Sequence, residues 1–143
     1  MANNRLYDHG RNDFAKGDIH WKVGGDTFKV TVVDLADYTP DFVNDHYMNT
    51  NTIPLIARLA TGTLTVLDPV AGVMDADDVA LGAITGDVAE LLIVWKDGGE
   101  GGVSAAGTLD RLLMHIDTGA GLPITPIGGT YSVVWNVSGI AKL

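Results

Sequence analysis

The sequence contains no cysteine, and it has little glutamate and few basic residues. Without cysteine the chain can form no disulfide, no thiolate metal site and no cysteine nucleophile. Only two of the eighteen acidic residues are glutamate, and the other sixteen are aspartate. Because glutamate favours helix interiors whereas aspartate favours turns and helix caps, this choice predicts a protein with little helix.

Basic side chains are too few to balance the acidic ones, which leaves a formal net charge of −9. Such a surface repels nucleic-acid phosphates and anionic lipids, so we expect neither nucleic acid nor membrane as a partner. Residues 1–29 hold five basic side chains against four acids, whereas the remainder holds four against fourteen. This asymmetry fits either a solvated face or contact of the N-terminal part with an acidic neighbour, such as another copy of the chain.

Long hydrophobic runs are also missing, so no segment approaches membrane-spanning length. The first residues lead into polar sequence without the apolar core of a signal peptide. With 143 residues, of which 46% are hydrophobic, the chain is long enough to bury a real core as one domain. We therefore expect a single folded domain over residues 17–143, preceded by an N-terminal arm over residues 1–16.

The longest strand-forming run is at residues 88–97, and its segment from Leu91 to Val94 has no polar position. A run this short between glycine-containing turns predicts a central strand that is buried on both faces. Residues 18–23 and 27–34 alternate around Gly24 and Gly25, which predicts an opening hairpin. Further strand patterns are at residues 63–67, 79–84, 109–116 and 130–137.

These short strands, separated by turns rich in glycine and aspartate, predict an all-β fold. The regular alternation of helix and strand that characterises parallel α/β proteins is missing. We therefore expect an antiparallel β-sandwich or a small β-barrel, with the N-terminal arm and one irregular or partly helical excursion.

The arm and the excursion supply the candidate contact residues. Apolar side chains of the arm fall roughly on one side of a helix that Gly17 could end, although Gly10 weakens that helix by about 1 kcal/mol relative to alanine. Within residues 36–60 the strand pattern lapses, and such a long excursion either packs on its own domain or contacts a subunit. The candidate contacts are Leu6, Tyr7, Arg11, Phe14, Phe42, Tyr47, Met48 and Ile53.

Residue types that carry catalysis form no recognisable motif. The serines stand in no nucleophile elbow, and the four histidines are scattered. The loop at residues 98–102 is rich in glycine, but it lacks the Lys-Ser/Thr pair of a phosphate loop, and Glu100 would repel phosphate. We therefore predict neither an enzyme nor a bound cofactor, and we expect this loop to be flexible.

One acidic run, at residues 75–78, is the best cation candidate, because clustered carboxylates suit calcium. Its acids are Asp75, Asp77 and Asp78. The spacing does not match an EF-hand loop, since the sixth and twelfth positions are Ala80 and Gly86 instead of glycine and glutamate. A solvated turn is the default interpretation, and no metal site is predicted.

Several phrases, spread over nearly the whole chain, resemble a group of small proteins of tailed bacteriophages that are described as hypothetical or virion structural proteins. The phrases are ANNRLYDHGR (2–11), FAKGDI (14–19), VVDLADY (32–38) and IDTGAGLPITPIGG (116–129). They include no catalytic motif.

The resemblance implies a capsid decoration (cement) protein, made in the host cytoplasm and located on the capsid exterior of the virion. Its partners would be the major capsid protein and other copies of itself, with a trimer as one possible arrangement. A tail or head-fibre component, or a module that binds the host surface, is the alternative. Under this interpretation, deleting residues 1–16 would weaken binding to the particle and leave the domain folded.

Overall fold

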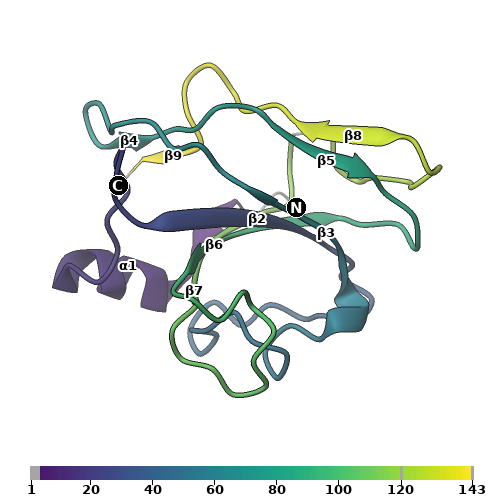
Figure 1. Cartoon of the computed structure of the whole chain (residues 1–143), viewed down its shortest axis with the longest axis horizontal. Helices are drawn as coiled ribbons and strands as arrows, with labels where there is room; N and C mark the ends of the chain where they lie inside the picture. The colour runs from purple at the N-terminus through teal and green to yellow at the C-terminus, as the bar shows by residue number, and fades with distance from the viewer. Residues whose placement is uncertain (1–3, 120, 143) are drawn as a thin grey trace.

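The structure, a computed structural model that describes residues 4–119 and 121–142, is built on a five-stranded sheet. The strand order is β1-β7-β6-β2-β3, and every neighbouring pair is antiparallel (Figure 1). The strands are β1 Arg5–Leu6, β2 Thr27–Val33, β3 Arg58–Thr63, β6 Leu91–Asp97 and β7 Arg111–Ile116. The predicted all-β class is confirmed.

Strand β6 lies in the middle of this sheet and is buried on both faces, as its apolar sequence predicts. Leu92 and Val94 belong to the hydrophobic core on one side of the sheet. Leu91, Ile93 and Trp95 belong to a second core on the other side. Because side chains alternate along a strand, an unbroken apolar run requires two separate covering layers.

The first covering layer is a two-stranded ribbon. It pairs β4 (Val73–Met74) with β9 (Ala141–Lys142), and β5 (Val79–Ala83) with β8 (Thr130–Val133). The two pairs follow one another along the same two chain segments, and Figure 1 shows them in one layer above the sheet. On this face only the narrow ribbon covers the five-stranded sheet. The sheet and the ribbon therefore form an open sandwich and not a barrel.

The second covering layer consists of the predicted irregular excursion together with the segment between β6 and β7. It contains two helical turns, closed by the hydrogen bonds from Asp45 N to Asp41 O (2.9 Å) and from Ile53 N to Asn49 O (3.0 Å), and the 3₁₀ helix η1 (Leu55–Ala57). Both segments lie below the sheet in Figure 1. Buried Met48 and Ile53 join the core on this side, so the excursion packs on its own domain.

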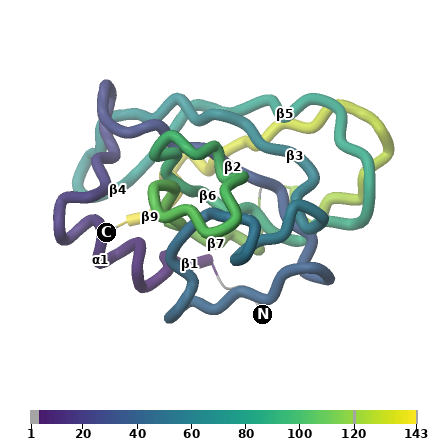
Figure 2. The backbone as a smooth tube through the Cα atoms, turned by 60° about the horizontal axis from the view of Figure 1, so that its bottom comes forward, coloured from purple at the N-terminus to yellow at the C-terminus, as the bar shows by residue number. Residues whose placement is uncertain are grey.

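Helix α1 (Asp8–Lys16) crosses β7 at one side of the sheet (Figure 2). Gly10 makes this close crossing possible, because a Cβ atom at this position would lie 3.1 Å from the carbonyl oxygens of Leu112 and Leu113. Gly17 ends the helix in the left-handed conformation, with φ of 81°, as the sequence predicts.

The expected N-terminal arm is not separate from the sheet. Arg5 and Leu6 pair with His115 and Met114 as the edge strand β1. Tyr7 follows them and is fully buried. Residues 4–16 are therefore part of the domain, since their backbone and apolar side chains are satisfied by β7 and by the cores on either side of it.

The opening hairpin is a second correction. Residues 18–26 form turns instead of a strand, because the backbone N–H groups of Gly25 and Asp26 bond to the carbonyls of Lys22 and His20. Strand β2 pairs with β6 and β3 instead. The strand expected at residues 63–67 is not formed there. Strand β3 spans Arg58–Thr63, and after Thr63 the chain crosses into the ribbon layer.

From the sequence we expect the domain to stay folded when residues 1–16 are deleted. The packing of residues 4–16 predicts the opposite outcome. This deletion removes β1, α1 and the buried Tyr7, and it exposes the edge of β7. We expect no cooperative unfolding transition, because the loss approaches the total stability of a domain, about 5–15 kcal/mol. Deleting only Ala2 and Asn3 is the control, and a native-like melting curve for the longer deletion would contradict the packing.

Candidate functional site

The candidate contact residues of the N-terminal segment face mainly inward. Leu6 and Tyr7 are buried, and Phe14 packs partly buried against the core beneath the ribbon. Arg11 is exposed and lies 3.8 Å from the carboxylate of Asp8. In this fold Leu6 and Tyr7 cannot form a surface for a partner, because the sheet itself covers them.

The candidate contact residues of the excursion are likewise drawn toward the domain. Met48 and Ile53 are fully buried, while Phe42 and Tyr47 are half-buried. The ring of Phe42 packs 5.5 Å from that of Tyr7, and the guanidinium of Arg5 lies over it at 4.3 Å. The structure thus brings the two predicted contact sets together, but against each other and not on an open surface.

A buried chain of hydroxyl groups links the excursion to Tyr7. The Tyr38 hydroxyl donates to Asp45 Oδ2 (2.7 Å), so the Tyr7 hydroxyl must donate to Tyr38 (2.8 Å). Burial raises the pKa of both tyrosines well above the usual value of 10. Both phenols therefore stay protonated and serve as structural hydrogen-bond donors.

A polar cluster around Asp13 holds α1 against the rest of the domain. The fully buried Asp13 carboxylate lies 2.8 Å from Arg111 Nη1 and 2.9 Å from His46 Nε2. The His46 ring is stacked between His9 (4.1 Å between centroids) and Tyr47 (3.9 Å). An aspartate–histidine pair can orient a catalytic base, but here Arg111 shares the carboxylate and two rings cover the imidazole. The cluster is therefore a structural clamp.

The glycine-rich loop at residues 98–102 is not free, contrary to the expectation from its composition. The buried carboxylate of Asp110 accepts hydrogen bonds from the backbone N–H groups of Gly98, Glu100 and Gly102. Arg58 then donates to the carbonyl of Gly102 (2.7 Å). The loop encloses a carboxylate of its own chain, and so its amides are not available to a phosphate.

The acidic run at residues 75–78 does not come together as a cation site. Asp75 Oδ1 accepts the N–H of Ala76, and Asp78 Oδ1 accepts the N–H of Trp135, which follows β8. Asp77 is exposed. In the part of the chain that the structure describes, the only carboxylates close enough to share a cation belong to a different set.

That set is Asp34, Asp37 and Asp87, whose oxygens lie within 4.8 Å of one another. Asp34 is buried and already accepts the N–H of Ala36 (2.7 Å), while the other two are exposed. The close spacing of Asp34 and Asp37 is visible in the sequence. Asp87 joins them only because the connection from β5 to β6 returns to the same end of the sheet, which no local pattern reveals.

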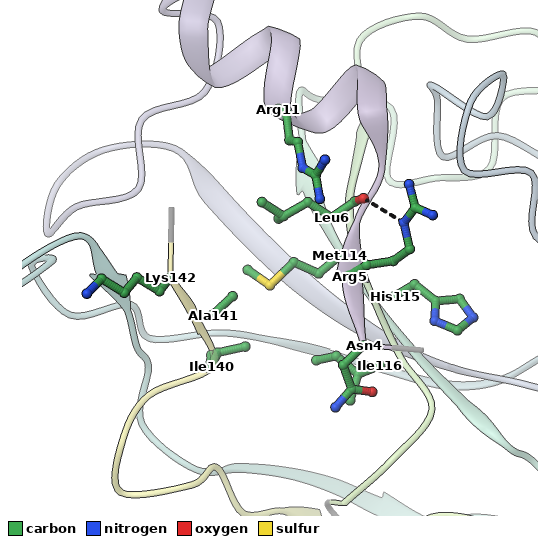
Figure 3. A pocket seen from close by; sticks show the side chains of 10 residues that line it. All are labelled: Asn4, Arg5, Leu6, Arg11, Met114, His115, Ile116, Ile140, Ala141 and Lys142. Carbon is green, nitrogen blue, oxygen red and sulfur yellow. Dashed lines mark hydrogen bonds between the residues drawn. The ribbon is translucent and has the colours of Figure 1, made fainter. Parts of the chain in front are cut away.

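A hollow of about 270 Å³ separates β1 from β9 (Figure 3). Leu6, Met114 and Ile140 line it on the ribbon side, whereas Figure 3 shows Arg5 on the opposite side of the β1 backbone. Asp8 pairs with Arg5 at 3.2 Å and also approaches Arg11, so it neutralises part of the local positive charge. The hollow is therefore a gap in apolar cover and not a prepared anion site.

Two groups of exposed apolar side chains line hollows of the surface and could contact partners. We call the first the ribbon patch, which consists of the exposed Leu67, Val70 and Val137 together with the half-buried Val73. The second, which we call the η1 patch, consists of Leu55 and Val103 beside β3. Neither group was among the candidate contacts, because each combines residues distant in sequence and its exposure depends on the tertiary fold.

Comparison with other proteins adds no assignment. No model of a known protein family matches the chain, and no curated protein matches it. Among the described residues, no helix has both the length and the apolar character needed to span a membrane. The contact surfaces must therefore be interpreted from their own geometry.

The clamp around Asp13 predicts acid sensitivity. Burial lowers the pKa of His46 below 6.5 despite the opposing attraction of Asp13. The unfolded chain therefore binds more protons than the folded chain just below pH 6.5, and the free energy of unfolding should fall as the pH drops through that range. Urea unfolding between about pH 7.5 and 5.5 measures this fall.

The variant His46→Gln should lose part of this pH dependence, because glutamine can donate to Asp13 but does not titrate. His20→Gln, at an exposed histidine outside the clamp, is the matched control for the loss of one histidine. An identical pH dependence in wild type and His46→Gln would show that His46 does not contribute.

Proposed function

We propose that this protein is a structural component of a bacteriophage virion that decorates the capsid shell and binds it through the ribbon patch. The observation that carries the proposal is the exposure of this apolar group on a rigid support. Val70 retains 75% and Val137 all of its accessible surface. The resemblance of the sequence phrases to virion structural proteins supplies the identity of the partner, the major capsid protein.

The ribbon patch is suited to contact because it is both apolar and shallow. Its residues line a hollow of about 320 Å³ on the turn between β3 and β4 and on the loop between β8 and β9. Asp68 and Asp75 stand at its rim. An apolar centre with a polar rim is typical of protein–protein interfaces.

The backbone beneath the patch is held in place, so that binding requires little ordering. Val70 and Val73 bond to each other through their backbone N–H and C=O groups, which closes the turn. Asp68 Oδ1 accepts the N–H of Val23 (2.9 Å), which ties the turn to the segment before β2. A preorganised surface keeps more of its contact energy as affinity.

A decoration protein also gains from repetition. Each copy that binds the assembled shell, but not its free subunits, stabilises the assembled state by mass action. Contacts that are modest singly become effective when one particle carries many of them. A small patch on a compact domain is sufficient under these conditions, and no catalytic group is required.

The test uses shells that lack the protein and measures its binding to them. The change Val137→Asp places a charge at the centre of the ribbon patch and should weaken binding at least about tenfold, or about 1.4 kcal/mol. Val43→Asp is the matched control, since Val43 is 61% exposed on the opposite covering layer. Both variants should unfold like the wild type, because neither side chain is buried.

Cryo-electron microscopy of the particle distinguishes the alternatives. Density of this size repeated over the capsid lattice, with the ribbon toward the shell, is the expected result. Density restricted to the tail or to fibres would assign the protein there instead. Unchanged binding by Val137→Asp would rule out the ribbon patch as the contact.

A further inference from the structure

Strand β3 is an edge of the sheet whose outer backbone groups have no partner in the described chain. Its only strand neighbour is β2. The hydrogen bond from Leu64 N to Phe28 O (2.9 Å) fixes the alternation of the antiparallel ladder. Gly62 therefore turns its N–H and C=O toward β2, whereas Thr61 and Thr63 turn theirs outward. No described residue forms a backbone hydrogen bond with these outward groups.

This edge lacks most of the devices that usually prevent strand pairing. Natural edge strands are commonly protected by charged residues, by proline, by bulges or by brevity. Residues 59–63 contain neither charge nor proline, and the bulge opposite Val32 and Val33 leaves the stretch from Ala60 to Thr63 regular. The ribbon covers one face of the strand near Gly62, but Thr61 and Thr63 are exposed.

The other edge of the sheet, unlike β3, offers little strand for pairing. Strand β1 has only two residues, and the chain turns directly from it into α1. The Asn4 side chain fixes its start by accepting the backbone N–H groups of Asp117 and Thr118. The contrast identifies β3 as the edge that is long enough, and open enough, to receive another strand.

The surface beside β3 contains no carboxylate among its lining residues. It forms a hollow of about 480 Å³ that includes Leu55, Trp95 and Val103. Leu55 is 58% and Val103 63% exposed. In a chain with eighteen acidic residues, a surface strip without acids next to an open strand is distinctive.

The two cations of this surface are fixed by their own chain. Arg58 donates to the carbonyls of Ile53, Asn49 and Gly102. Lys29 lies 2.9 Å from the carboxylate of Asp97. Partial burial would raise the pKa of Asp97, but Lys29 and neighbouring backbone N–H groups lower it to about 2, so the pair stays charged. The strip is therefore neutral to slightly positive.

These charges favour a second copy of the chain as the occupant. Two copies with a net charge of −9 repel each other, and the repulsion is weakest where neither presents carboxylates. A strand that carries no charge over residues 59–63 and has free outward groups is also complementary to itself, because two antiparallel copies related by a two-fold axis exchange identical hydrogen bonds.

We propose that two copies of this chain pair through their β3 edges, antiparallel and about a two-fold axis, so that the two sheets become continuous. In this arrangement the start of each β3 lies beside the end of the other, and the η1 patch of each copy covers Thr63 of the other. The pairing does not depend on the proposed contact with the capsid shell, since it uses the opposite covering layer.

A proline substitution tests the pairing with a matched control. Thr63→Pro removes the outward N–H of β3, and Thr63→Val removes only the hydroxyl. In sedimentation velocity over a concentration series without shells, wild type and Thr63→Val should form a two-copy species. Thr63→Pro should weaken this association at least about tenfold. Circular dichroism and urea unfolding check that the fold is retained.

A second variant covers the case in which proline disturbs the fold. Leu55→Asp changes an exposed side chain and should also weaken association about tenfold, because it brings acidic groups to a surface that has no carboxylate among its lining residues. A wild type that stays monomeric throughout the concentration series overturns the pairing, as does a Thr63→Pro variant that folds and still dimerises. If the wild type is monomeric and Thr63→Pro no longer binds shells, the edge receives a strand of the shell protein instead.

Discussion

Strand β6 is apolar on both faces, and the rest of the chain is arranged to cover it twice. A strand with one polar face could lie at the surface of a simple sandwich, but β6 buries Leu92 on one side and Trp95 on the other. The ribbon supplies one cover and the irregular layer the other. One layer is a ribbon of strands and the other is a layer of loops. Few strands remain once the central sheet is complete, so the second cover is made of loops.

A layer made of loops has many backbone N–H and C=O groups that no strand ladder pairs. Buried polar side chains form hydrogen bonds with these groups instead. The Asp110 carboxylate binds three backbone N–H groups of the loop after β6. Arg58 binds three carbonyls, and the two tyrosine hydroxyls reach Asp45. Each group would be costly if it were buried alone. These buried polar residues therefore brace the irregular layer.

The sequence is sufficient to predict what depends on local pattern. The apolar run of β6, the strand at residues 111–116, the end of α1 at Gly17 and the irregular excursion all follow from neighbouring residues. The hairpin at residues 18–34 fails because alternation specifies which side chains are buried but not which strand they pair with. Ile19 and Trp21 are indeed buried, yet in a loop. Gly10 shows the same limit: as local sequence it only weakens a helix, but in the fold it permits contact with β7.

Four of the candidate contact residues, Leu6, Tyr7, Met48 and Ile53, are buried for a related reason, and their burial is informative about which surfaces remain open to a partner. Large apolar side chains such as Tyr7 and Met48 are the natural choice from sequence, but their size is what draws them into the core. The surfaces that remain are built from small and medium side chains, valine and threonine above all, on segments brought together by the fold. The sheet also has one edge formed by a two-residue strand that leads into a helix, and one open edge that carries no charge over residues 59–63. The surfaces left open to a partner are therefore set by the backbone groups and the side chains that the core cannot use, which is a property of the whole topology that no single stretch of sequence contains.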